Sequence, residues 1–300
     1  MDSIALALIL SKVASSLKTP QESCDFLAPF VEAKSKLSSE ARLCLEMDIV
    51  VSRLKMGGQL AQVKASLEET SSKLQASSIK EPMVYSKYYR ASAEYRKVAG
   101  PADEFLKHAL LFLTYTPVEI LHAQERYELA TDIAMSAVCG DGVFNLGEVI
   151  ATPIVTGLEG TPNGWLLDII RALHTGDIVQ FNAIVDANRD KYFAQPALAA
   201  NHETIKKKAV LLCVLNIAFG RDPHDRSISF QEIATKAAIP LNQVEWVLMR
   251  ALSIGIIRGC IDEVEGNIAV NWVQPRVLDS MQISNVSAQM KSWSDRYCRY

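Results

Sequence analysis

Two short helices followed by a β-hairpin are encoded between residues 228 and 278, and this order constrains the fold more than any other feature of the chain. Ser229 stands three residues before Glu232, which is the spacing of a capping box at the start of a helix. Pro240 ends this helix, because proline disfavours helical geometry in the residue before it. Gly255 is a natural stop for the second helix. This order of elements is typical of a winged helix.

The second helix and the hairpin are predicted from spacing and alternation. Asn242 and Glu245 repeat the cap spacing at the start of the second helix. Residues 256–261 indicate a strand and residues 265–267 a turn. The returning strand alternates apolar side chains at Ile268, Val270 and Trp272. Because alternate residues of a strand share one face, we expect Trp272 in the core, where its replacement by alanine costs about 3–5 kcal/mol.

A winged helix commonly binds DNA, but the charges of this module argue against that function. A DNA-reading helix and wing need Lys and Arg to neutralise phosphates, and side chains that reach base edges. The predicted recognition helix offers one cation, Arg250, and the wing carries Asp262, Glu263 and Glu265. The whole chain has a net charge of −3, whereas a nucleic-acid-binding domain typically carries a basic stripe. We therefore predict binding to proteins, with nucleic-acid binding as the alternative.

Residues 1–220 are predicted to form one helix after another, because apolar residues recur three and four positions apart and turn residues interrupt the pattern. The spacing of the turns suits antiparallel helix pairs stacked in a right-handed α-solenoid that is similar to tetratricopeptide arrays but lacks their strict repeat. The predicted fold is mainly α, with a solenoid over residues 1–220, a winged helix with a small sheet over 221–279, and a helical tail over 280–300.

Two clusters in the solenoid have a structural and a functional interpretation. Residues 85–95 hold four tyrosines, which we expect to pack between helices and not to form a ligand surface. Lys206, Lys207 and Lys208 could attract an anionic partner, but we expect them on the solvated face of a helix. The apolar run over residues 209–219, interrupted by Asn216, predicts that the same helix is buried along its second half.

No pattern of catalytic, cofactor-binding or metal-binding residues is found. The histidines lack the spacing of a metal site, and His224 stands in a polar loop: His108, His122, His174, His202 and His224. The glycines of residues 140–147 follow no predicted strand and precede no Lys-Ser/Thr pair, so we interpret them as a turn between helices and not as a phosphate-binding loop. The sequence therefore predicts a protein that is not an enzyme and needs no cofactor or metal.

The cysteines and the apolar runs predict the compartment. None of the six cysteines forms a C-x-x-C pair, which favours free thiols: Cys24, Cys44, Cys139, Cys213, Cys260 and Cys298. The apolar run over residues 4–10 lacks the basic leader of a signal peptide. The run over residues 209–219 is too short to cross a bilayer. We therefore expect a protein of the cytoplasm and nucleus that is not bound to a membrane.

A helical solenoid that ends in a non-basic winged helix resembles the PCI module, which builds the proteasome lid, the COP9 signalosome and translation initiation factor 3. Within that class, four segments are similar to the 26S proteasome non-ATPase regulatory subunit 13 family: residues 140–148 (GDGVFNLGE), 164–181 (GWLLDIIRALHTGDIVQF), 228–234 (ISFQEIA) and 261–279 (IDEVEGNIAVNWVQPRVLD). The acidic I-D-E-V followed by W-V-Q-P-R-V-L-D is the most specific of these features. The resemblance is strong over residues 80–279.

The resemblance implies a lid subunit without catalytic activity, which acts in lid assembly and stability and thereby in ubiquitin-dependent degradation. Its implied partners are the neighbouring PCI subunits and the regulatory particle, and not nucleic acid, a membrane or a second copy. A subunit of another PCI complex is the alternative. Family members normally carry further helices before residue 1 of this chain and a long helix after the winged helix, so residues 280–300 are expected to be a shortened form of that helix.

Two surfaces are expected to contact partners. Residues 268–273 are a candidate edge strand that a neighbouring sheet could extend, with the acidic wing available to steer a basic neighbour. The final helix begins an apolar stripe. The predicted interface residues are Asp262, Glu263, Glu265, Ile268, Val270, Trp272, Val273, Ile283, Val286, Met290 and Trp293.

Overall fold

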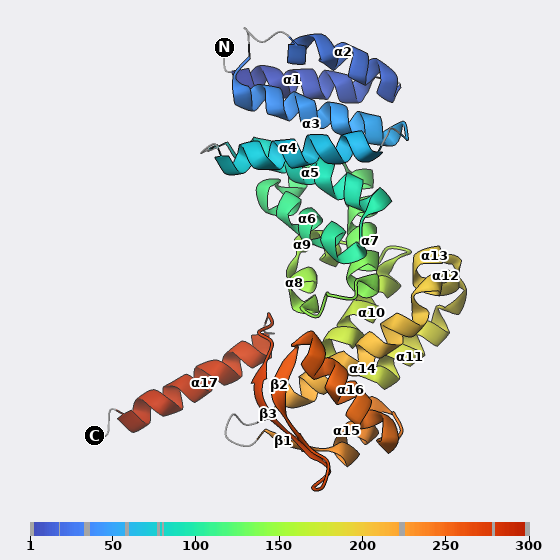
Figure 1. The fold of residues 1–300 in the computed structure, drawn as a ribbon, viewed down its shortest axis with the longest axis vertical. Helices are drawn as coiled ribbons and strands as arrows, with labels where there is room; N and C mark the ends of the chain where they lie inside the picture. Colours follow the sequence, from blue (N-terminus) through green and yellow to red (C-terminus); the bar gives the residue numbers. More distant parts are fainter. Residues whose placement is uncertain are drawn as a thin grey trace. The chain divides into compact units, whose positions relative to one another are not determined.

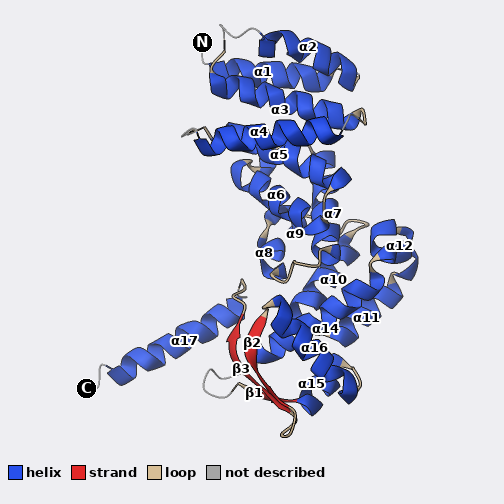
Figure 2. Cartoon of the chain, in the orientation of Figure 1, coloured by secondary structure: helices blue, strands red, loops and turns tan. Residues whose placement is uncertain are grey.

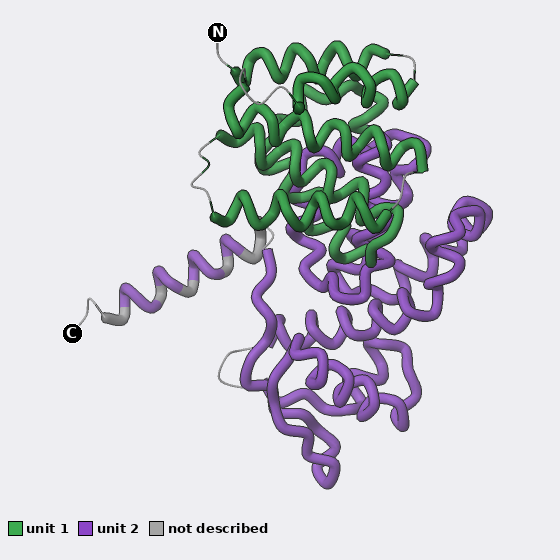
Figure 3. The backbone as a smooth tube through the Cα atoms, turned by 45° about the horizontal axis from the view of Figure 1, so that its top comes forward, with its two compact units in different colours: residues 1–126 green, residues 127–300 purple. Residues whose placement is uncertain are grey.

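The computed structural model describes residues 3–17, 19–32, 37–57, 60–76, 79, 81–221, 226–277 and 280–297. Over these residues the chain is mainly helical, with a three-stranded sheet near its C-terminal end (Figures 1 and 2). The chain divides into an N-terminal unit, residues 1–126, and a C-terminal unit, residues 127–300 (Figure 3). The predicted fold class, helical repeats followed by a winged-helix module, is confirmed.

The N-terminal unit is a stack of helices in which sequence neighbours pack together (Figure 1). Its elements are α1 (Ser3–Ser16), α2 (Pro20–Glu32), α3 (Ser39–Lys55), α4 (Leu60–Ala76), α5 (Pro82–Ala99), α6 (Ala102–Tyr115), a 3-10 turn η1 (Val118–Ile120) and the start of α7 (Ala123–Cys139). Leu27 and Leu45 are fully buried between α1, α2 and α3. A largely buried ion pair also joins these helices. Lys87 Nζ on α5 lies 2.7 Å from Asp48 Oδ1 on α3 and 2.5 Å from Ser11 Oγ on α1.

The tyrosine-rich helix α5 packs on α6, as predicted. The rings of Tyr85 and Tyr89 both stack on Tyr115, with ring centroids 5.4 Å and 5.7 Å apart. The Tyr85 hydroxyl donates a hydrogen bond of 3.2 Å to the carbonyl of Ile79. These rings therefore hold two neighbouring helices together through aromatic contacts.

The C-terminal unit is built around one long helix. Its helices before the sheet are α7, α8 (Leu146–Ala151), α9 (Pro153–Thr156), α10 (Gly164–Thr175), α11 (Ile178–Ala187), α12 (Arg189–Ala194), α13 (Pro196–Ala200) and α14 (His202–Phe219). Apolar residues of α14 are buried on nearly every side, because this helix packs against α10, α11 and the winged helix. The expected turn at residues 140–145 connects α7 to α8.

The prediction that the basic run lies on a solvated helix face is wrong for Lys208. This residue is buried, whereas Lys206 and Lys207 are exposed. Its ammonium donates to the carbonyls of Ala137 at 2.7 Å, Val138 at 3.3 Å and Gly140 at 2.7 Å. These carbonyls belong to the last turn of α7 and the residue that follows it, where no further helical N–H can reach them. A cation is also favoured at the negative end of the helix dipole. Lys208 therefore caps α7 from inside the core.

The winged helix comprises β1 (Ser227–Ser229), α15 (Phe230–Ala237), α16 (Leu241–Ile254), β2 (Ile257–Asp262) and β3 (Asn267–Val273). Ser229 Oγ accepts a hydrogen bond of 3.3 Å from the Glu232 N–H, which confirms the Ser229 half of the predicted capping box, whereas the Glu232 carboxylate pairs with Arg221 and Lys236. Gly255 ends α16 with a φ of 80°. The predicted cap at Asn242 is wrong, because α16 already begins at Leu241 and its cap residue is Pro240. Strand β1 is an addition to the predicted elements.

A bulge in the hairpin overturns the predicted core position of Trp272. Pairing runs from Asp262 opposite Asn267 to Gly259 opposite Val270, and then Arg258 lies opposite Trp272, so β3 contains one extra residue. One extra residue moves the following side chain to the other face of a strand. The Trp272 ring is accordingly half-buried on the outer face, where the Arg258 guanidinium carbon lies 4.8 Å from its centroid.

This position sets the cost of losing the ring. Trp272→Ala is expected to lower the free energy of unfolding by only about 1–2 kcal/mol, because it removes a cation–π contact and partial burial. Ile268→Ala in the same strand is expected to cost about 2–5 kcal/mol, since Ile268 is fully buried. Urea denaturation of both variants tests the ranking, and an equal or larger loss for Trp272→Ala would contradict the outward position.

Candidate interaction surfaces

The tip of the wing is an exposed acidic turn. Glu263 and Glu265 are exposed, and Val264 between them is 95% exposed. Asp262 has a different role, because its Oδ1 accepts hydrogen bonds of 3.0 Å from the N–H groups of Val264 and Glu265. The turn is completed by Gly266 at a φ of 62°. Two of the three predicted wing carboxylates are therefore free to face a partner, whereas the third shapes the turn.

The expected edge strand lies in the middle of the sheet. The strand order is β1-β3-β2, so β3 pairs with β1 over residues 267–269 and with β2 over residues 267–273. Ile268 and Val270 are buried, while Val273 and Trp272 are half-buried. The prediction that residues 268–273 form an edge is therefore wrong for residues 268–270, which are bonded on both sides, whereas Trp272 and Val273 are paired, among the described residues, with β2 alone. Within the residues that the structure describes, β2 is paired on one side only, so its outer edge is the longer one available for strand addition.

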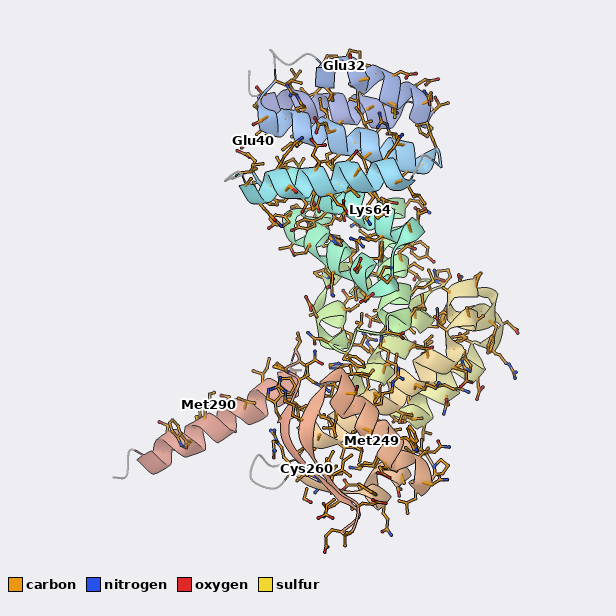
Figure 4. The ribbon with its side chains drawn as sticks, viewed as in Figure 1. Glu32, Glu40, Lys64, Met249, Cys260 and Met290 are labelled. Atoms are coloured by element: carbon orange, nitrogen blue, oxygen red, sulfur yellow. The ribbon has the colours of Figure 1, made fainter. Side chains whose placement is uncertain are left out.

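The predicted apolar stripe lies on α17 (Ser280–Tyr297). Its members follow at steps of three and four residues, which places them on one face of the helix. They are 36–66% exposed: Ile283, Val286, Met290 (labelled in Figure 4) and Trp293. An exposed apolar helix face of this kind typically marks a protein-binding surface.

The segment between β3 and α17 is fastened to the helices of the C-terminal unit. The Gln274 N–H donates to the carbonyl of Ile256 at 2.8 Å, and the Val277 N–H donates to Asn145 Oδ1 at 3.2 Å. Arg276 donates to Asn216 Oδ1 and lies over the ring of Phe219, with its guanidinium carbon 5.0 Å from the centroid. Residues 274–277, which we call the clasp, therefore set the direction in which the chain leaves the sheet.

The clasp brings together three of the four segments that carry the family resemblance. A Cβ atom at Gly147 would lie 3.0 Å from Val277 Cβ, so the clasp packs closely on this glycine and a larger residue would require a small shift. Asn216 also donates to the His174 carbonyl at 2.9 Å, and a Cβ at Gly176 would lie 2.6 Å from its Nδ2. Sequence reasoning missed these contacts, although the interruption of the apolar run by Asn216 was a signal for them.

Two buried groups of the C-terminal unit have raised pKa values. Burial raises the pKa of the Cys213 thiol to about 11 and the pKa of Tyr192 to about 12. In the described part of the chain, no group of three or more His, Cys, Asp or Glu side chains is placed to hold a metal ion. His224 and Cys298 lie outside the described residues. Among the helices that the structure describes, none is both long and apolar enough to cross a membrane.

Comparison with known proteins covers both units. The family model described as PSD13 N-terminal repeats matches residues 1–170, and the PCI domain model matches residues 185–272. The 26S proteasome non-ATPase regulatory subunit 13 homolog B of Arabidopsis thaliana is 35% identical over 268 residues, which are 88% of this chain and 69% of the relative. The 26S proteasome non-ATPase regulatory subunit 13 of Dictyostelium discoideum is 35% identical over 238 residues, 79% of this chain and 62% of the relative.

A more distant relative belongs to one of the alternative complexes. The eukaryotic translation initiation factor 3 subunit M of Nematostella vectensis is 24% identical over 185 residues, which are 62% of this chain and 45% of that protein. The chain is thus similar to PCI proteins in general, and more similar to the first two relatives. It spans about two thirds of their length.

Proposed function

The chain belongs to the 26S proteasome non-ATPase regulatory subunit 13 family, and we propose that it is a non-catalytic scaffold subunit in the lid of the proteasome regulatory particle. The observation that carries this proposal is the match to family-specific repeats over residues 1–170, followed by a PCI domain over residues 185–272. A place in translation initiation factor 3 is less well supported, because the identity falls to 24%.

In this role the chain acts in assembly and stability of the lid, and thereby in ubiquitin-dependent protein degradation. The partners that we propose are other lid subunits and the rest of the regulatory particle, and not nucleic acid, a membrane or a second copy. The proposed location is the cytoplasm and nucleus, in keeping with the free thiols at Cys24, Cys44, Cys139, Cys213 and Cys260.

The α17 stripe is the surface on which we expect incorporation to depend most. Ile283→Ala together with Met290→Ala removes two exposed apolar side chains from one face and keeps good helix formers. We expect the fraction of tagged chain that sediments with the 26S particle in an extract of the source cells to fall about tenfold or more. Ser284→Ala with Lys291→Ala, a pair of exposed residues with the same spacing on another face of α17, is the matched control. Equal sedimentation of both double variants would contradict this role.

The acidic wing tip is proposed to steer the chain toward a basic neighbour. Glu263→Lys with Glu265→Lys is expected to weaken association with copurifying lid subunits about three- to tenfold at low salt, and less at high salt, since screening weakens charge steering. Thermal unfolding is expected to stay unchanged, because both side chains are exposed and Asp262 still closes the turn. Unaltered association at low salt would rule out the steering.

A further inference from the structure

A groove of about 890 Å³ lies in the C-terminal unit between α11, α14 and α16. Ile178 and Phe181 of α11 line this groove, and both are buried. The exposed face of α16 forms one side, and the exposed face of α14 forms the other. This groove is separate from the α17 stripe and from the acidic wing tip.

The walls have the length and periodicity of a helix-binding site. On α16 the lining residues run from Gln243 to Ser253, and on α14 from Glu203 to Leu211. At 1.5 Å per residue these stretches are about 15 Å and 12 Å long, or two to three helical turns. Apolar grooves between helices commonly receive an amphipathic helix that inserts side chains at steps of three and four residues.

The α16 wall exposes large apolar side chains. Trp246 is 72% exposed and Met249, labelled in Figure 4, is 41% exposed, whereas Val244 and Leu248 on the inner face are buried. A winged helix that reads DNA presents this outer face of its second helix to base edges. Here the face offers a tryptophan and a methionine, residue types that are enriched at protein interfaces.

The rim of the groove is basic, although the chain as a whole is acidic. Lys206, Lys207 and Arg250 are exposed at the groove, and Glu203 is the one acidic residue among its lining side chains. Across the ranges that the structure covers, no ion pair engages these three cations. A partner with carboxylates would gain favourable contacts here, whereas a basic partner would be repelled.

We propose that this groove binds an acidic amphipathic α-helix of a partner protein. The apolar face of that helix lies against Trp246 and Met249, and its carboxylates face Lys206, Lys207 and Arg250. The chain's own α17 does not fit this description, because its charged residues are Lys291, Asp295 and Arg296, which leave it basic. The proposal goes beyond membership of the lid, since it names a second surface with the opposite charge to the wing tip.

The test measures binding of designed peptides to the purified full chain by fluorescence anisotropy. The probes are a panel of fluorescein-labelled 16-residue helical peptides (a length of about four turns) with Leu, Ile, Phe or Trp along one face and Glu elsewhere. We expect saturable binding of acidic members of the panel. Two sets of control peptides are expected to bind at least about tenfold more weakly: peptides with Lys in place of Glu, and scrambled peptides of the same composition.

Variants of the groove separate specific binding from general attraction. Trp246→Ala is expected to weaken binding about 30-fold, as for a central interface tryptophan. Lys206→Glu with Lys207→Glu is expected to weaken it about tenfold. Lys12→Glu with Lys191→Glu makes the same change of net charge at exposed sites outside the groove and is expected to leave binding unchanged. Unaltered thermal unfolding confirms that each variant is folded.

Several results would overturn the proposal. These are failure of the whole acidic panel to bind, equal binding of the scrambled peptides, or equal loss in the control variant. Salt-sensitive binding of a DNA duplex that Lys206→Glu with Lys207→Glu abolishes would assign the groove to nucleic acid instead. Dimerisation in sedimentation velocity that Trp246→Ala abolishes would assign it to a second copy. Peptide binding and 26S sedimentation are independent readouts, so either idea can fail alone.

Discussion

Lys208→Met is expected to lower the free energy of unfolding of the C-terminal unit by about 3–5 kcal/mol, because it removes several hydrogen bonds from a charged donor, each of which contributes about 1.5–3 kcal/mol. Methionine keeps much of the length and apolar stem of the side chain but donates no hydrogen bond. The carbonyls of Ala137 and Val138 then lose the Lys208 donor inside the core, while the Gly140 carbonyl keeps only a 3.4 Å hydrogen bond from the Val143 N–H. An unsatisfied buried carbonyl costs more than a hydrogen bond contributes.

Tryptophan fluorescence during urea denaturation measures this loss selectively. All four tryptophans belong to the C-terminal unit, so the signal follows that unit in the intact chain: Trp165, Trp246, Trp272 and Trp293. Lys207→Met is the matched control, because Lys207 is the exposed neighbour, and its expected effect is within about 0.5 kcal/mol. Similar midpoints for the two variants would mean that Lys208 does not cap α7 as described.

Gly259→Ala is expected to cost about 2–4 kcal/mol through a backbone collision in the wing hairpin. A Cβ atom at residue 259 would lie 2.2 Å from the carbonyl oxygen of Ala269, in the paired strand. Real Cβ atoms essentially never approach so closely, and a backbone oxygen cannot turn aside as a side chain can. The two strands must therefore separate at the bulge, which breaks their hydrogen bonds.

The control for this substitution is in the same hairpin. Gly266 has a φ of 62°, but no atom lies within 4 Å of a Cβ added there. Gly266→Ala therefore carries the strain of a left-handed residue alone, about 1–2 kcal/mol. Both variants are compared by tryptophan fluorescence in urea. If Gly266→Ala is the more destabilising of the two, the close approach of β2 and β3 at Gly259 is incorrect.

Features that depend on local chemistry could be predicted from the sequence. The Ser229 cap and the Gly255 stop follow from the side chain or backbone freedom of one residue, and both are present. The order of helices, hairpin and turn follows from periodicity. Strand β1 escaped prediction because three residues are too few to display alternation.

Features that depend on distant contacts could not be predicted. Strand order decides that β3 is central, and no pattern within β3 encodes it. The bulge changes the face on which Trp272 lies through its pairing with Arg258. Lys208 resembles its neighbours in sequence, and only the end of α7, about 70 residues earlier, distinguishes it.

The candidate surfaces also include features that could be predicted from local sequence and features that could not. Exposure of the acidic wing tip and of the α17 stripe follows from local composition and spacing, and was predicted. The contacts of Arg276 with Asn216 and of Val277 with Asn145 join segments 60 and 132 residues apart, so they required the structure. The groove beside Trp246 also required it, because its walls come from separate helices.

Affinity purification of the tagged full chain from the cells that make it, followed by quantitative mass spectrometry, tests the proposed function most directly. We expect the subunits of the lid and of the regulatory particle to be recovered in amounts nearly equal to that of the tagged chain. Recovery of the chain alone or with chaperones, or with the subunits of a different PCI complex, would contradict a role as a lid subunit.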